Sequence, residues 1–422
     1  MAVVRPFKAI RPKNDKASFV VSRSYEDYSK KELNATLKFN PFSFLHIINP
    51  GFKFDKKVVG NERFKLVRNR YLEFLEEDVL MKDAQDCFYL YQIEKNNFSC
   101  CGLFAATSVA DYRNGVIKKH EDTISRREKL FANYLQTVKF NAEPVLMTYP
   151  DTDSIAKIFD QEKQRSPEYH FTTTDKVTHR LWPISDEKII RKIKDEFADI
   201  NALYIADGHH RCASSDLLAN ISEKANPEHS GKEPYNYFMG YLIPESEIYI
   251  YEFNRMAKDL NGLTKEEFLV RLDEYFRIQN KGVILYKPTR KHHFGMYLDG
   301  EFYSLYLRKK AYAFTDPLSE LDTQILYKTI LEPILGITDL RNDKRITYGY
   351  GKHNVLRMKD EIDKGNYKVG FTLVPLTMDE IKDIADANLV MPPKSTYIEP
   401  KLRSGLAIYE LEYKKNRNLT VK

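Results

Sequence analysis

Residues 203–211, with the sequence LYIADGHHR, constrain the fold of this chain more than any other segment. A short apolar run that suits a buried strand ends at Asp207-Gly208, and the residues from His209 onward can open a helix. A strand, a glycine turn and a helix N-terminus leave backbone N–H groups that can hold an anion. The guanidinium of Arg211 matches phosphate oxygens, so we expect a phosphate-binding site here, with His210 among its ligands.

Two other interpretations of this turn stay open. In the first, its polar groups only cap the following helix. In the second, His209 and His210 hold a metal ion, although adjacent histidines aim poorly at one ion and no third histidine follows at ligand spacing. We rank phosphate binding first and metal binding last.

The length of 422 residues exceeds what one hydrophobic core usually serves, and it predicts two domains. The polar loop at residues 224–233 is the best internal boundary signal. We expect an N-terminal α/β domain over residues 1–245 and an α+β domain over residues 246–422. Expected helices and strands alternate in the first half, which predicts a mixed sheet with helices packed on it. The helices are expected at 61–79, 122–138, 154–164 and 186–197, and the strands at 87–93, 100–109, 144–149 and 177–183.

The second half also shows both kinds of element. Capping-box patterns at residues 264–267 and 377–380 predict helix starts. Alternating apolar residues on both sides of Asp299-Gly300 predict a hairpin of strands 292–297 and 301–307. A further helix is expected over residues 321–335, ending at Gly336.

Composition favours a cytoplasmic protein with a small-molecule partner. The N-terminus lacks an apolar signal core, and no apolar run approaches membrane-spanning length. The net charge of +6 comes from 66 basic and 60 acidic residues that are interspersed rather than gathered into a basic stripe. We therefore expect no membrane partner and no nucleic acid, while a homodimer is among the expected assemblies.

A second polar cluster lies at residues 118–123, where two lysines, His120 and two carboxylates precede an expected helix. The carboxylates suit the positive N-terminal end of that helix, which is a purely structural role. The functional alternative makes Glu121 or His120 a general base and Lys119 a phosphate partner.

Two further segments carry weaker signals. Residues 391–405 form a stiff loop with the cations Lys394, Lys401 and Arg403 beside several hydroxyls, and such a loop suits either anion capture or plain solvent exposure. Of this loop, we name Lys394, Ser395 and Thr396 as phosphate-binding candidates. On the expected strand at 177–183, His179 and Trp182 either border a substrate pocket or pack in the core.

The chain resembles the domain-of-unknown-function 1015 family nearly from end to end. Five segments in a fixed order carry the resemblance: residues 5–12 (RPFKAIRP), 40–45 (NPFSFL), 119–123 (KHEDT), 206–211 (ADGHHR) and 391–396 (MPPKST).

The Asp-Gly-His-His-Arg box of that family is similar to the phosphate-binding box of the ParB and sulfiredoxin superfamily, which includes free-serine kinases. The resemblance implies a ParB/sulfiredoxin-like N-terminal domain and a nucleotide-dependent kinase that converts free L-serine to O-phosphoserine. ATP or ADP would donate the phosphoryl group, and Mg²⁺ would bridge the phosphates with help from Asp207.

Carried over residue by residue, the box falls on residues 207–211. Among them we name Asp207 and His209 as catalytic candidates and Gly208, His210 and Arg211 as phosphate ligands. Glu121 is our choice of general base on chemistry alone. The alternative function is a nucleotide-binding or nucleotide-hydrolysing regulatory protein without kinase activity.

Overall fold

The computed structural model describes residues 1–95, 98–350 and 354–412, and the chain divides into two compact units. Unit 1 holds residues 1–118 and 123–248 together with the described residues from Pro400 onward, and unit 2 holds residues 119–122 and 249–399. The chain thus leaves unit 1 after Ile248 and re-enters it at Pro400. Domain limits at 1–245 and 246–422 stay a prediction.

Within the described residues, unit 1 is built on a nine-stranded mixed sheet. Its order is β6-β11-β8-β12-β5-β4-β10-β9, and β1 pairs with β5 on the edge opposite to β12. Strand β11 runs parallel to β6, and β12 runs parallel to β8, whereas the other neighbours are antiparallel. The strands are β1 (Val4–Arg5), β4 (Phe88–Lys95), β5 (Phe98–Ser108), β6 (Ile117–Lys118), β8 (Val145–Tyr149), β9 (Tyr169–Thr172), β10 (Thr178–Ile184), β11 (Leu203–Asp207) and β12 (Tyr237–Pro244).

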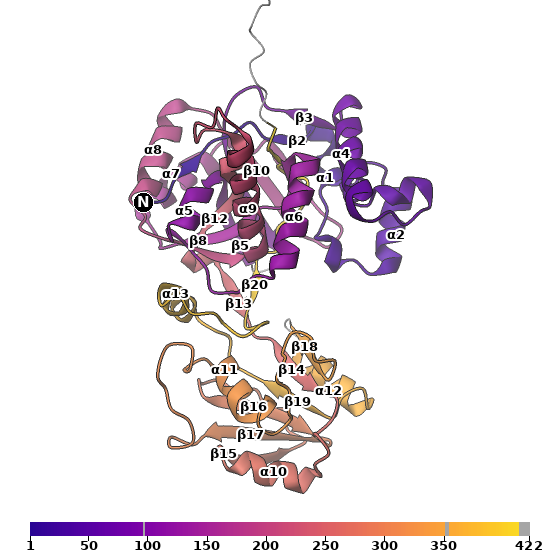
Figure 1. Cartoon of the computed structure of the whole chain (residues 1–422), viewed down its shortest axis with the longest axis vertical. Helices are drawn as coiled ribbons and strands as arrows, with labels where there is room; N and C mark the ends of the chain where they lie inside the picture. The colour runs from indigo at the N-terminus through magenta and orange to yellow at the C-terminus, as the bar shows by residue number, and fades with distance from the viewer. Residues whose placement is uncertain (96–97, 351–353, 413–422) are drawn as a thin grey trace, which may run out of the picture. The chain divides into compact units, whose positions relative to one another are not determined.

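Two short strand pairs accompany this sheet: β2 (Ile10–Pro12) with β3 (Leu80–Lys82), and β7 (Phe140–Asn141) with β21 (Tyr409–Glu410). Helices pack around the sheet and the strand pairs, and α9 and α6 lie side by side (Figure 1). The helices are α1 (Ala17–Val20), α2 (Lys30–Phe39), α3 (Leu45–Ile48), α4 (Gly60–Glu76), α5 (Val109–Arg113), α6 (Ser125–Val138), α7 (Asp153–Lys163), α8 (Glu187–Ala198) and α9 (His209–Ala225).

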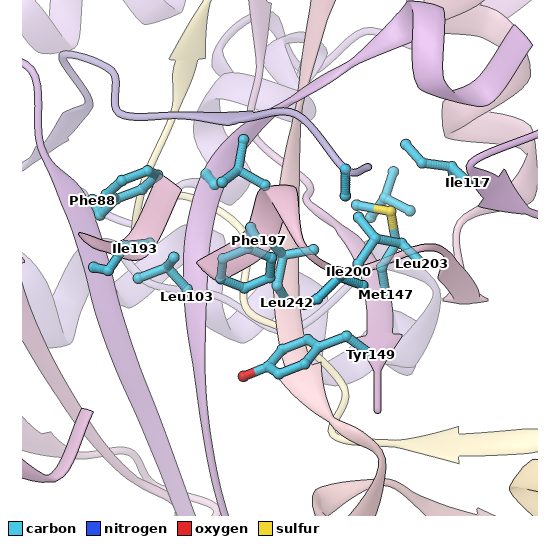
Figure 2. Close-up of a cluster of buried hydrophobic side chains, with 14 of the residues drawn as sticks. Phe88, Leu103, Ile117, Met147, Tyr149, Ile193, Phe197, Ile200, Leu203 and Leu242 are labelled. Atoms are coloured by element: carbon cyan, nitrogen blue, oxygen red, sulfur yellow. The ribbon is translucent and has the colours of Figure 1, made fainter. Parts of the chain in front are cut away.

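The central strands of unit 1 are buried on both faces. On one face, side chains of the sheet meet apolar residues of α7 and α8, and Figure 2 shows Phe197 of α8 among Leu103, Met147 and Leu242. On the other face, Tyr91 stacks on Phe104 with ring centroids 5.2 Å apart. Full burial of one such side chain contributes about 1.5–3 kcal/mol, so this core fixes the strand ends that carry the polar turn.

Unit 2 contains, within its described residues, a six-stranded antiparallel sheet of order β15-β17-β16-β19-β14-β18 and a separate pair, β13 with β20. Its strands are β13 (Tyr249–Tyr251), β14 (Asn254–Ala257), β15 (Phe276–Gly282), β16 (His293–Leu298), β17 (Glu301–Leu307), β18 (Ile346–Gly349), β19 (Val369–Thr372) and β20 (Tyr397–Glu399). Its helices are α10 (Lys265–Asp273), α11 (Asp322–Leu326), the π-helical η6 (Tyr327–Leu331), α12 (Asn354–Asp363) and α13 (Met378–Asp386).

The mixed α/β class is confirmed, and so are both capping boxes and the hairpin at Asp299-Gly300. The helix expected over residues 321–335 differs, because the regular helix α11 ends at Leu326 and widens into the π turn η6, which ends at Leu331. Pro333 has no N–H to donate, and its ring clashes with the carbonyl four residues earlier in a regular helix. Among the described residues, no helix is long and apolar enough to cross a membrane.

Candidate functional site: the glycine turn between β11 and α9

The predicted strand–turn–helix segment is present in unit 1. Strand β11 ends at Asp207, Gly208 forms the turn, and the 17-residue helix α9 begins at His209. The pairing of β11 with β8 shifts register between Ile205 and Asp207, which turns the end of the strand. Gly208 has a φ of 111°, a left-handed conformation that favours glycine because it has no Cβ.

Gly208 also allows a close approach by a cation. A Cβ at this position would lie 3.2 Å from both Nε and Cζ of Arg211, and 3.4 Å from Cα of Val145. The guanidinium therefore lies directly over the glycine. Gly208 is also the N-cap residue of α9 and has no side chain to cap it, so the positive N-terminal end of this helix carries no side-chain cap.

Three charged side chains meet at the turn. Nη2 of Arg211 donates to Oδ2 of Asp207 at 3.2 Å, and its Nη1 donates to the carbonyl of Pro144. Nζ of Lys401 lies 3.7 Å from the same Asp207 oxygen. Burial acts to raise the pKa of Asp207, but the charges of Arg211, Lys401 and His209 outweigh it and lower that pKa. Asp207 is therefore an ionised carboxylate that faces two cations.

The two histidines of the box occupy the first turn of α9. His209 is buried, whereas His210 is half-buried, and its carbonyl accepts a hydrogen bond from the hydroxyl of Ser214. Successive helical residues point about 100° apart, so these imidazoles face different surroundings. In residues 1–95, 98–350 and 354–412, no group of three or more His, Cys, Asp or Glu is placed to hold a metal ion.

The predicted cluster at residues 119–121 belongs to unit 2, whereas the glycine turn belongs to unit 1. His120 is buried, and its carbonyl accepts a hydrogen bond from the N–H of Met391 at 2.9 Å. This bond joins the cluster that contains Lys119 and Glu121 to the loop at residues 391–396. Two motifs more than 250 residues apart are thus neighbours in unit 2.

Hydrogen bonds from buried side chains hold the loop that follows Met391. The hydroxyl of Ser395 is buried and donates to the carbonyl of Pro392 at 2.7 Å, so it supports the loop. Lys394 has a φ of 59°, an uncommon value for a residue with a side chain, and its carbonyl accepts a hydrogen bond from the buried Arg255. Thr396 is half-buried.

His179 and Trp182 lie in the interior of unit 1. This position agrees with core packing, which was one of the two interpretations of these residues. Trp182 is 3% exposed, and its indole N–H donates to the carbonyl of Arg165 at 2.9 Å. Nδ1 of His179 lies 2.7 Å from the hydroxyl of Tyr91. Burial, helped by the charge of Arg403, lowers the pKa of His179 to about 3 and keeps it neutral. Neither side chain enters the site that we propose.

Lys401 was named from the sequence only as one cation of its loop, and not as a phosphate-binding candidate. Its loop was noted for its cations, but nothing in the sequence pairs it with a carboxylate 194 positions earlier.

The fold and the turn define a two-unit α/β protein with a cationic turn between a strand and a helix. The sequence profile of the family described as "Protein of unknown function (DUF1015)" matches residues 4–324, so the chain belongs to this family. No curated protein matches it.

Solved structures that are similar to the chain are distant. A free serine kinase in complex with AMP has 12% identity and a TM-score of 0.33, over 76% of this chain and 95% of that one. SbnI with a C-terminal truncation, from Staphylococcus aureus, has 12% identity and a TM-score of 0.39, over 73% and 87%. A conserved hypothetical protein from Pyrococcus furiosus has 12% identity and a TM-score of 0.30, over 74% and 97%.

Proposed function

We propose that this protein is a nucleotide-dependent kinase that phosphorylates the hydroxyl of free L-serine. The observation that carries the proposal is the position of the Arg211 guanidinium over Gly208, at the N-terminal end of a 17-residue helix. A guanidinium and a helix N-terminus both attract phosphate, and the glycine lets the two lie together. We also propose that unit 1 is a ParB/sulfiredoxin-like domain, as the family resemblance implies.

The reaction is an in-line phosphoryl transfer from ATP or ADP. The serine hydroxyl oxygen bonds to the terminal phosphorus while the bond from that phosphorus to the bridging oxygen breaks. The bridging oxygen keeps the electron pair and leaves with the shortened nucleotide, and the hydroxyl proton passes to a carboxylate base. Arg211 and the first-turn N–H groups of α9 stabilise the charge on the transferring oxygens, which is the main catalytic requirement of this chemistry.

The residues at the turn fit Mg²⁺ only as a partner of the nucleotide. Asp207 supplies one ionised carboxylate, and magnesium in phosphate sites commonly takes one or two carboxylates with phosphate oxygens and water. When bound, the ion would neutralise phosphate charge. The carboxylate of Asp207 would hold it.

Glu121 is our candidate for the base that accepts the hydroxyl proton. The variant Glu121→Gln keeps the size of the side chain and removes its basicity. We expect it to bind nucleotide like the wild type and to lose at least about 10²-fold in rate, the usual contribution of a positioned base. Unchanged turnover in this variant would assign the base elsewhere without affecting the phosphate site.

The function is tested by incubating the full chain with Mg²⁺, L-serine and a panel of nucleotides, and by mass spectrometry of the products. The proposal predicts O-phosphoserine and an equal amount of shortened nucleotide. Omitting serine is the control, because a regulatory nucleotide hydrolase releases inorganic phosphate at the same rate with and without it. Phosphate release that ignores serine, with no phosphoserine, would contradict the proposal.

A further inference from the structure

The C-terminal part of the chain returns to unit 1 and is fixed there by backbone hydrogen bonds. The N–H of Ser404 donates to the carbonyl of Ser22 at 2.9 Å, and the reverse bond measures 3.2 Å. Further along, Ile408 and Ile10 exchange two bonds of 2.8 and 3.0 Å. These anchors give the preceding residues 400–403 a defined position on unit 1.

The buried side chain of Arg403 adds an ion pair to these anchors. Its side chain is 7% exposed, and its Nη2 lies 2.7 Å from Oδ2 of Asp175. The hydroxyl of Thr173 donates to the other oxygen of Asp175 at 2.7 Å. Burial acts to raise the pKa of Asp175, but the Thr173 hydrogen bond and the Arg403 charge lower it to about 2, so the carboxylate stays ionised.

Lys401, two residues before Arg403, reaches the glycine turn. Its Nζ lies 3.7 Å from Oδ2 of Asp207, the same oxygen that accepts a hydrogen bond from Arg211. The side chains of Lys401 and Asp207 are 37% and 44% exposed, so solvent and small anions reach this pair. Two cations that share one carboxylate attract an anion that carries two or more negative charges.

We propose that Lys401 is a phosphate ligand of the nucleotide site, supplied by the C-terminal segment, and that Arg403 is the positioning residue that holds it there through Asp175. The proposal rests on the proposed function, because it takes the ligand of the turn to be a nucleotide. Arg211 binds from α9 in the middle of the sequence, and Lys401 binds from the C-terminal segment. The phosphate site is therefore complete only when the segment from Pro400 is docked on unit 1.

The test measures the dissociation constant of ATP by calorimetry for the full-length wild type and its variants. Lys401→Met should weaken binding roughly tenfold, as loss of one charge-assisted contact does, and Lys401→Arg should retain most of the affinity. The matched control is Lys13→Met, because Lys13 has 40% exposure and an ion pair of 3.0 Å with Asp78 in the same unit. It should bind ATP like the wild type.

Arg403 is tested by conservative rescue. Arg403→Ala should weaken ATP binding, whereas Arg403→Lys can still pair with Asp175 and should recover part of the lost affinity. Circular dichroism of each variant checks that the fold is kept. ATP affinity in Lys401→Met equal to that of Lys13→Met would overturn the inference and leave the proposed function intact. A folded wild type that binds no nucleotide would overturn both, and it is recognised from the wild type alone.

Discussion

Replacing Gly208 with alanine separates the two roles that the structure gives this glycine. At a φ of 111° an alanine is strained, and a left-handed backbone costs a residue with a Cβ about 1–2 kcal/mol. The new methyl group would also lie 3.2 Å from the guanidinium of Arg211, closer than ordinary contact. The guanidinium must then move away from the turn. We expect the free energy of unfolding to fall by about 1–2 kcal/mol and nucleotide affinity to fall at least roughly tenfold.

A second glycine of unit 1 provides the control. Gly115 has a φ of 74°, and a Cβ there would meet no atom within 4 Å. Gly115→Ala therefore imposes backbone strain without a new contact, and it should lower the unfolding free energy by a similar amount. Its affinity for nucleotide should be that of the wild type.

Urea unfolding measures the stability of both variants, and calorimetric titration with ATP measures their binding. The two proteins should differ in binding far more than in stability. Equal ATP affinity in Gly208→Ala and Gly115→Ala would refute the argument that the guanidinium over the glycine binds phosphate.

Three further predictions follow from other residues. Arg211→Ala should reduce the rate of phosphoserine formation roughly tenfold or more in a steady-state assay, because it removes charge that stabilises the transferring phosphoryl group; an unchanged rate would exclude that role. Asp322 is fully buried, and burial raises its pKa to about 6. Between the ordinary value of 3.8 and about 6 the folded protein binds more protons, so this group's contribution to stability falls as pH rises through that window. At about pH 7.5 the unfolding free energy of Asp322→Asn should exceed that of the wild type by on the order of 1–3 kcal/mol, and near about pH 4 the two values should be equal. Urea unfolding at both pH values measures this difference. A difference that does not change with pH would contradict the prediction. Thr264→Ala should lower the unfolding free energy by about 1 kcal/mol, since it removes the cap bond to the N–H of Glu267; denaturant titration showing no loss would contradict it.

Local chemistry made much of the fold predictable from the sequence. A capping threonine followed by glutamate three positions later specifies a helix start by itself, as at Thr264 and Thr377. The Asp299-Gly300 turn likewise specifies its hairpin. The helix expected to run to residue 335 differs from the structure, although the apolar period continues past Pro333. Beyond this proline the N–H groups of Leu335 and Ile337 donate to carbonyls five and six residues earlier, so these backbone bonds are wider than those of an α-helix.

The candidate site also has one part that the local sequence predicts and one part that it does not. The Asp207-Gly208 turn and Arg211 are adjacent in sequence, so their geometry follows from a strand, a glycine and a helix. Lys401 meets Asp207 only because the chain crosses unit 2 and returns. Such a contact is set by tertiary packing, and no local pattern encodes it.

The most direct test of the central claim is a crystal structure of the full chain with bound ADP and Mg²⁺. The account predicts that the terminal phosphate lies at the N-terminus of α9, within hydrogen-bonding distance of the Arg211 guanidinium and the first-turn N–H groups. A nucleotide whose phosphates bind elsewhere, with Arg211 still held by Asp207 and Pro144, would contradict it.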